Sequence, residues 1–291
     1  MRVLIVGCGF VGLPLGRELA RQGHQVYGLR RSVNADGELK AAGITPLHAD
    51  ITKPGTLSSL PCNFEWVANC AASGGGGVDD YRRLYLDGTR NLIDWLGGSP
   101  PQKYVYTSST SVYGQDDGSV VAESSPTTPP TETGHVLIET ENLLQAAATR
   151  NIPAVILRVA GIYGPGRGYW FKQFLKDAAQ IEGHGERFLN MIHRDDVVGC
   201  IIAALENGKP GEIYNAVDDE PVSQLDCFTW LAGQLKKAMP PSVPADANSA
   251  RKRGTTNKRV LNLRLKQELG YQFKYPTFRD GYAAEIQQLA P

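Results

Sequence analysis

The sequence predicts an α/β fold in which a doubly wound parallel sheet carries a smaller C-terminal lobe. Apolar runs such as RVLIV at residues 2–6 end at glycine or polar residues, which is typical of strands covered by helices on both faces. These runs alternate along the chain with stretches of helical periodicity. After Gly164 the alternation loosens and the helical pieces are shorter. We therefore expect residues 1–165 to form the main domain, with segment 190–216 returning to it, and residues 166–291 to form mainly the lobe.

The elements follow in an order that requires crossover helices between parallel strands. Strand 2–7, helix 11–23 and strand 24–31 make a βαβ unit, and strand 44–49 comes next. The alternation then continues through strand 65–72, helix 80–96, strand 103–109, helix 131–144 and strand 153–164. Helix 191–208 and strand 212–217 are expected to return to the same sheet. A Pro-rich stretch near residues 240–250 offers no core face and is expected to be a surface loop.

Charge and length restrict the class of partner. The 291 residues include 30 basic and 30 acidic side chains, so the formal net charge is zero. A neutral chain lacks the field of a nucleic-acid or acidic-membrane binder, which leaves a small molecule as the expected partner. The N-terminal MRVLIVGCG has no signal-peptide pattern, and no apolar run is long enough to cross a bilayer. These features predict a cytoplasmic protein.

The five cysteines do not form a metal or disulfide pattern. They are widely spaced, odd in number and without a CxxC pair: Cys8, Cys62, Cys70, Cys200 and Cys227. Such cysteines are expected to be reduced, and we predict no metal site.

A glycine motif follows the first predicted strand directly. Gly7, Gly9 and Gly12 form G-x-G-x-x-G at the start of a helix, with Phe10 and Val11 between the last two. In this context the glycines let the backbone turn tightly and approach a pyrophosphate at the helix N-terminus, as in a Rossmann dinucleotide site. The alternative is a tight strand-to-helix turn with no ligand.

The residues after the second strand indicate which dinucleotide is bound. An acidic residue there would bind the ribose 2′-hydroxyl, whereas Arg30, Arg31 and Ser32 suit a 2′-phosphate. NADP is therefore favoured, with NAD possible, and two solvated arginines are the plain alternative. Asp50, after the third strand, is expected near the adenine.

Three further predictions concern residues at the carboxyl ends of the later strands. Ala71 and Ala72 are taken as cofactor contacts, and Ser109 is placed where its hydroxyl can meet the nicotinamide, unless it only satisfies loop backbone groups.

With these pieces in place, the chain resembles the short-chain dehydrogenase/reductase superfamily, in its extended branch, the NAD-dependent epimerase/dehydratase family. The resemblance runs over nearly the whole chain and is carried in order by GCGFVG, NCAA, SSTSVYG, LRVAGIYGPGR, IHRDDVV and EIYNAVDDEPVS. It implies a Rossmann domain, a C-terminal substrate lobe, and a catalytic set of Ser or Thr, Tyr and Lys. Ser109 matches the serine, because it stands four residues before the Tyr of VYG.

The resemblance also shows where this chain departs from the family. Aligning Gly134 and Glu141 with the family's Y-G-x-x-K stretch puts Thr133 at the Tyr position and Leu137 at the Lys position. A Tyr needs a neighbouring cation to act as a base near neutral pH, so the ordinary mechanism lacks both partners. A second departure is Tyr85, where the family often has an Asn. The pattern is similar to the atypical members of the superfamily.

Substitute residues are available near the expected site. Tyr113, Tyr163, His135 and His193 are candidates by position, with Tyr113 first as proton donor because it is nearest to Ser109 in sequence. Tyr163 and His193 are also taken as substrate contacts, although His193 could instead orient loops.

Arg158 is a third substrate-contact candidate. It either neutralises a substrate phosphate or pairs with Asp195 or Asp196. The basic stretch 250–259 is expected to be a solvated face or a diphosphate contact.

Two functions follow from these observations. The first is an NAD(P)-binding, epimerase/dehydratase-like oxidoreductase acting on a nucleotide-sugar or small carbonyl substrate. The second is a non-catalytic regulator that senses NADP(H). The family further implies a homodimer with a four-helix interface from residues 80–97 and 134–149, or a monomer. Leu84, Leu92, Trp95, Leu143 and Leu144 give the apolar stripes, which could equally cover the sheet.

Overall fold

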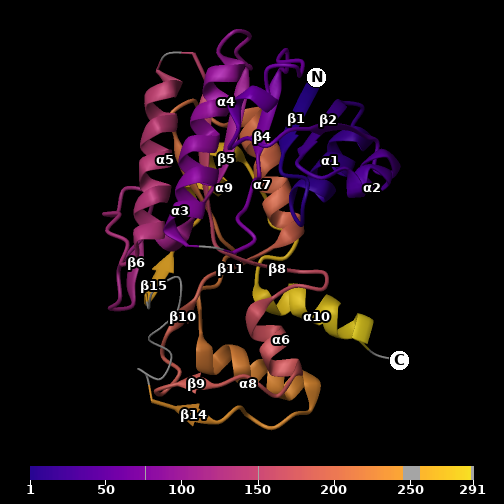
Figure 1. Cartoon of the computed structure of the whole chain (residues 1–291). Helices are drawn as coiled ribbons and strands as arrows, with labels where there is room; N and C mark the ends of the chain where they lie inside the picture. Colours follow the sequence, from indigo (N-terminus) through magenta and orange to yellow (C-terminus); the bar gives the residue numbers. More distant parts are fainter. Residues whose placement is uncertain (76, 150, 245–255, 290–291) are drawn as a thin grey trace.

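A seven-stranded parallel sheet forms the centre of the upper part of the molecule (Figure 1). The computed structural model describes residues 1–75, 77–149, 151–244 and 256–289. The strands lie in the order β12-β7-β5-β4-β1-β2-β3, and all six pairings are parallel. Their bounds are β1 Arg2–Val6, β2 Gln25–Arg30, β3 Ile44–His48, β4 Trp66–Asn69, β5 Lys103–Ser109, β7 Ala154–Val159 and β12 Ile213–Ala216. The predicted doubly wound parallel sheet is confirmed.

Alternating side chains of the strands build two separate cores, one on each face of the sheet. In β1, Val3 and Ile5 belong to one core, and Leu4 and Val6 to the other. The Val3 face is covered by α1 Gly12–Arg21, α2 Asp36–Ala41, α7 Arg194–Asn207 and α9 Leu263–Leu269. The Leu4 face is covered by α4 Gly88–Leu96 and α5 Glu132–Ala148. Burial on both faces explains why the strand sequences are continuous apolar runs.

The helix expected over residues 80–96 contains a wider turn. It consists of α3 Val78–Tyr81, the π-helix η3 Arg82–Asp87 and then α4. Where the ordinary helix resumes, Gly88 approaches Ile51 so closely that an added Cβ would lie 2.9 Å from the Ile51 side chain. π-turns often occur at functional sites, and this one carries Tyr85.

The helices and strands in the lower part of the molecule (Figure 1) enclose a separate aromatic core. It gathers α6 Tyr169–Leu175, α8 Gln224–Leu235 and α10 Phe278–Leu289 around buried rings such as Phe171, Phe228 and Tyr282. The described residues also form four two-stranded sheets: β6 Ser119–Val121 with β15 Lys258–Val260, β8 Gly161–Tyr163 with β11 Met191–His193, β9 Ile181–Glu182 with β14 Ser242–Val243, and β10 Phe188–Leu189 with β13 Val222–Ser223. Short 3₁₀ turns are η1 Val33–Ala35, η2 Pro54–Thr56 and η4 Thr110–Val112. The boundary at residue 165 stays a prediction.

The C-terminal segment returns to the main sheet before it reaches α10. Helix α9 packs on α7 and β12. Asp196 of α7 is fully buried and fixes this return, since its carboxylate accepts hydrogen bonds from the Tyr271 hydroxyl (2.7 Å), the Lys274 amide (2.7 Å) and the Tyr275 amide (3.0 Å). A buried carboxylate with three donors is satisfied, so it holds two distant segments together.

Several sequence expectations can be placed on this fold. Leu92 and Leu144 of the proposed dimer stripes are fully buried within the chain, in the core of the Leu4 face. The five cysteines are free. No described helix is long and apolar enough to span a membrane. Of the expected loop near 240–250, residues 245–250 lie outside the described residues, as do residues 250–255 of the basic stretch.

Candidate functional site

A cavity of about 970 Å³ opens at the carboxyl ends of the central strands. One end is lined by the turn 7–11 after β1, by 30–32 after β2 and by 70–72 after β4. The other end is lined by 167–170, 187–191 and Tyr282, among others. The carboxyl edge of an open parallel sheet is where such folds bind ligands. The cavity therefore joins the sheet edge to the lower part of the molecule.

The glycine turn has the shape that a dinucleotide requires. Gly7 has φ +87°, and an added Cβ would lie 2.7 Å from the backbone N and Cα of Ala71. A Cβ on Gly12 would lie 2.3 Å from the Gly7 carbonyl oxygen, whereas a Cβ on Gly9 would meet no atom within 4 Å. Gly7 and Gly12 thus permit close packing of strand and helix, and Gly9 leaves open space in front of the α1 N-terminus. The cradle fits a pyrophosphate group.

The other predicted cofactor contacts lie along the same wall. Phe10, Val11, Arg30, Arg31, Ser32, Asp50, Ala71 and Ala72 all line the cavity. Within the described part of the chain, neither Arg30 nor Arg31 makes an ion pair, so both guanidinium groups can meet an anion. Asp50 accepts hydrogen bonds from the Thr52 amide (3.0 Å) and hydroxyl (2.8 Å), which fixes its carboxylate at the end of β3.

The two serines at the end of β5 face different partners. Ser109 lines the cavity, and its hydroxyl oxygen accepts a hydrogen bond from the Ser111 amide (3.2 Å). Ser108 also lines the cavity and donates to Glu141 (2.6 Å). Both predicted uses of Ser109, as a cavity hydroxyl and as a cap for the loop backbone, are therefore compatible with its position.

The two positions aligned with the family's Tyr and Lys differ in their surroundings. Leu137 lines the cavity and presents an apolar side chain there. Thr133 is not among the lining residues, and its hydroxyl lies 3.2 Å from that of Thr131, the N-cap of α5. Helix α5 therefore supplies this wall with packing and no acid or base.

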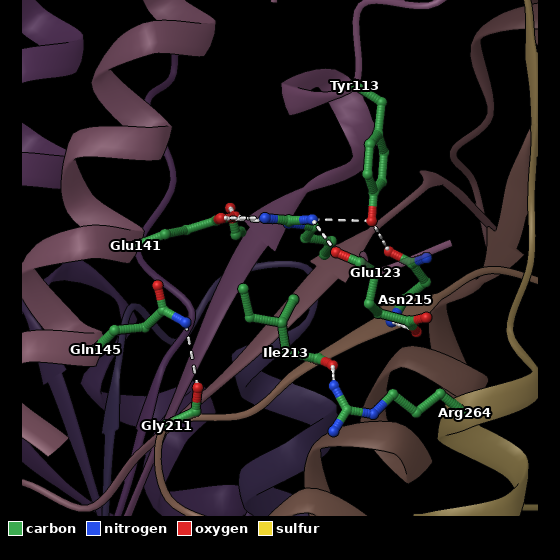
Figure 2. A network of polar contacts seen from close by, with 10 residues as sticks. Tyr113, Glu123, Glu141, Gln145, Gly211, Ile213, Asn215 and Arg264 are labelled. Carbon is green, nitrogen blue, oxygen red and sulfur yellow. Dashed lines mark hydrogen bonds and ion pairs between the residues drawn. The ribbon is translucent and has the colours of Figure 1, made fainter. Parts of the chain in front are cut away.

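Tyr113 and Arg158 do not line the cavity. Tyr113 belongs to a buried polar network that also contains Glu141 and Asn215 (Figure 2). The Arg158 guanidinium pairs with Glu141 through Nη2 and Oε2 (2.7 Å), so the predicted pairing with Asp195 or Asp196 is wrong. Arg158 Nη1 donates to the Tyr113 hydroxyl (2.9 Å), which donates to Asn215 (2.8 Å).

Burial sets the chemistry of this network. Tyr113 is fully buried, and this raises the pKa of its hydroxyl. That hydroxyl already donates to Asn215 and accepts from Arg158, so Tyr113 has a structural role at the edge of the sheet.

Tyr163 and the two histidines differ in their access to the cavity. Tyr163 lines it, and burial raises the pKa of its hydroxyl, which donates to the Thr277 carbonyl (3.3 Å). His193 lies outside the cavity and caps α7, since its Nδ1 accepts from the Asp195 amide (3.2 Å). Burial lowers the pKa of His193, so the neutral ring carries its proton on Nε2. His135 is exposed on α5 and does not line the cavity.

Lys258 and Arg187 are cavity residues that the sequence did not single out. Lys258 is 4% exposed, and its ammonium group donates to the Tyr113 carbonyl (2.7 Å) and the Thr256 hydroxyl (2.9 Å). Arg187 donates to the Thr256 carbonyl (3.2 Å) and pairs with Glu182 (3.3 Å). The basic stretch 250–259 contains Lys258, but the sequence did not reveal that β15 pairs with β6 and so brings Lys258 to the cavity.

The cavity wall carries far more positive than negative charge. Among the described residues, Asp50 is the one acidic residue on it. The basic residues on the wall are Arg30, Arg31, Arg167, Arg187 and Lys258. Because the whole chain is neutral, this excess is local, and it favours anionic ligands.

Lys258 should titrate near neutral pH. Burial lowers its pKa to about 8, with a smaller effect from the charge of Arg187. The ammonium charge is therefore present below pH 8 and is lost as the pH rises through 8, together with its attraction for an anion. Reductive ¹³C-methylation followed by NMR titration should show one lysine signal with a midpoint near 8, absent in Lys258→Met. A lowest midpoint near 10 would contradict the burial seen here.

Relatives share both the length and the sequence pattern of this chain. Residues 3–216 match the model of the NAD dependent epimerase/dehydratase family. Protein YeeZ of Escherichia coli is 30% identical, over 94% of this chain and 96% of its own.

Solved structures agree with this likeness. A putative NAD-dependent epimerase/dehydratase from Methylobacillus flagellatus is 32% identical with a TM-score of 0.79, covering 99% of this chain and 98% of its own. The UDP-glucuronic acid 4-epimerase of Bacillus cereus, in complex with UDP-glucuronic acid and NAD, covers 100% of both chains at 24% identity with a TM-score of 0.81, and shows the shared fold. Since the family match extends over most of the chain and takes in the glycine turn and the strand ends that line the cavity, the chain belongs to the NAD-dependent epimerase/dehydratase family.

Proposed function

We propose that the protein is an NADP(H)-dependent oxidoreductase of the epimerase/dehydratase type, acting on a nucleotide-sugar or small carbonyl substrate that carries an anionic group. The observation that carries this proposal is the continuous cavity, which extends from the glycine turn to Arg187 and Lys258. A dinucleotide binder without a substrate needs no cavity beyond the cofactor site. The family's name, and a structural neighbour named as a UDP-glucuronic acid 4-epimerase, support epimerase or dehydratase chemistry on a nucleotide-sugar.

Each group on the wall has a distinct part in this proposal. The turn 7–12 would hold the pyrophosphate, and Arg30 and Arg31 the 2′-phosphate. A bound nicotinamide supplies or accepts a hydride. Ser109 would orient the substrate oxygen, while Lys258 and Arg187 would attract its anionic group. Positioning of this kind can contribute much of the rate even where a strong acid/base pair is missing.

The proton donor must be a group other than those of the ordinary mechanism. Of the four substitutes considered, Tyr163 alone lines the cavity, while Tyr113, His135 and His193 do not. Burial raises the pKa of Tyr163, so its hydroxyl stays protonated but is a weak acid, and it donates to the Thr277 carbonyl (3.3 Å). We place Tyr163, or water, in this role. Thr133 and Leu137 are the observation that favours the alternative function, a regulator that senses NADP(H) without catalysis.

The cofactor assignment predicts a selective loss of NADPH affinity. Wild-type protein should bind NADPH more tightly than NADH in a fluorescence titration, and Arg30→Ala or Arg31→Ala should weaken NADPH about tenfold while NADH changes little, because only NADPH carries the 2′-phosphate. Arg21→Ala is a matched control, since Arg21 is exposed on α1 outside the cavity. Equal or stronger binding of NADH by the wild type would overturn the preference for NADP.

Turnover distinguishes the enzyme from the sensor. We expect wild-type protein to turn over at least one member of a panel of carbonyl compounds and nucleotide-sugars, half of them anionic. Net reduction of a carbonyl is monitored by the loss of NADPH absorbance, and epimerisation or dehydration, which returns the hydride to the substrate, by chromatography of the sugar product. Ser109→Ala should lower that rate at least about tenfold, because a positioned hydroxyl is lost, without changing NADPH affinity. Tight NADPH binding with no turnover across the panel would favour the sensor. The homodimer stays a prediction.

A further inference from the structure

Two guanidinium groups lie over one ring of the glycine turn. The carbon Cζ of Arg167 lies 4.8 Å from the centre of the Phe10 ring, and that of Arg194 lies 5.4 Å from it. Phe10 stands between Gly9 and Gly12, at the part of the turn where a pyrophosphate fits. Two like charges are thus held near the expected position of a dianionic group.

The two arginines are not equivalent. Arg194 is paired with Asp195, with Nη2 2.8 Å and Nε 2.9 Å from Oδ1, and does not line the cavity. Arg167 does line the cavity, is exposed at its mouth, and makes no side-chain hydrogen bond or ion pair with any residue that the structure describes. A guanidinium with five unused donors beside a phosphate cradle is suited to fork-like binding of phosphate oxygens.

The loop that carries Arg167 has a fixed shape. Gly164 and Arg167 exchange two backbone hydrogen bonds, of 3.0 and 2.7 Å. Gly164, Gly166 and Gly168 have φ values of +129°, +67° and +144°, which favour glycine. The Gly166 amide donates to Glu285 of α10 (3.3 Å), so the loop is tied to the lower part of the molecule.

We infer that Arg167 binds the pyrophosphate of the dinucleotide from the side opposite the α1 N-terminus, so that the cofactor is held between the glycine turn and the 164–168 loop. This inference rests on the proposed dinucleotide site. It adds a contact to the cofactor from a loop that lies far in sequence from the glycine turn. Phe10 is a positioning residue, because its ring holds the guanidinium above the turn. The same loop leads to Tyr169 and Trp170, which line the cavity, so a contact of Arg167 with the cofactor would link the cofactor end of the cavity to its lower end.

Titrations with ligands that differ in one group test this assignment. Arg167→Ala should weaken NADH, NADPH and ADP-ribose by the same factor, about tenfold, because all three share the pyrophosphate. The NADPH to NADH ratio should stay as in the wild type, unlike in Arg30→Ala. Arg167→Lys should recover part of the loss, since it keeps the charge without the fork. Arg279→Ala is the control: its guanidinium lies over the Phe278 ring (4.5 Å) and outside the cavity, so binding should be unchanged.

Other outcomes overturn the assignment. Unchanged ADP-ribose affinity in Arg167→Ala would remove the pyrophosphate contact, whether or not NADH is weakened. If Arg167→Ala had a lowered melting temperature and Arg279→Ala lost as much dinucleotide affinity, the loss of affinity would be a general structural effect and not the loss of a contact. If the wild type binds no dinucleotide, the proposed function fails together with this inference, whereas wild-type binding with an unaffected Arg167→Ala variant defeats only the inference.

Discussion

Replacing Gly12 with alanine should abolish dinucleotide binding and destabilise the protein. The added Cβ would lie 2.3 Å from the Gly7 carbonyl oxygen and 3.0 Å from the Ile5 side chain, so strand β1 and helix α1 must separate. We expect NADPH affinity to fall at least about a hundredfold, which corresponds to about 2.7 kcal/mol, and the melting temperature to drop. Fluorescence titration and thermal unfolding measure the two effects.

Substitutions at two other glycines separate a loss of space for the ligand from a loss of protein stability. Gly9→Ala should unfold at the wild-type temperature, because its Cβ meets no protein atom, and yet should lose dinucleotide affinity, since that space belongs to the ligand. Gly37 lies in α2, and its added Cβ would also have no close neighbour. Gly37→Ala should therefore leave the dinucleotide affinity unchanged and should not lower the melting temperature. If Gly9→Ala bound NADPH as the wild type does, the pyrophosphate would not lie at this turn.

Glu141→Ala should cost about 3–5 kcal/mol of unfolding free energy, because it leaves the buried Arg158 guanidinium without its carboxylate. Glu141 is 2% exposed and also accepts from Ser108, so a second buried polar group loses its partner. Urea denaturation followed by circular dichroism gives the value.

The same helix offers a matched control for this loss. Glu139 makes a comparable two-bond pair with Arg82, at 2.7 and 2.8 Å, but on the surface, so Glu139→Ala should unfold near the wild-type midpoint. The double variant Glu141→Leu with Arg158→Met should be more stable than Glu141→Ala, since it leaves no unpaired charge. Similar midpoints for Glu141→Ala and Glu139→Ala would show that water reaches the Arg158 pair.

Local patterns in the sequence sufficed for the sheet and for the cofactor end of the cavity. The apolar runs predicted the central strands, and the glycine motif placed the turn, because both depend on neighbouring residues. The partner of Arg158 depended on which helix covers β7, and charge alone could not choose Glu141 over Asp195 or Asp196. Lys258 was hidden for the same reason, since its contact with the Tyr113 carbonyl joins residues 145 positions apart. No periodicity in the sequence distinguishes the π-turn at Tyr85 from an ordinary helix.

The long sequence separation of the cavity walls has a consequence for biosynthesis. The wall begins at Val6 and ends at Tyr282, so almost the entire chain must leave the ribosome before the cavity can close. At about 5–20 residues per second, translation takes on the order of tens of seconds to cover that interval. Until β12 is made, β7 is an open edge of the nascent sheet, available for pairing with other chains. Ribosome-bound intermediates that stop before residue 213 should therefore need chaperone protection, whereas release after α10 should be followed by rapid closure around the cofactor.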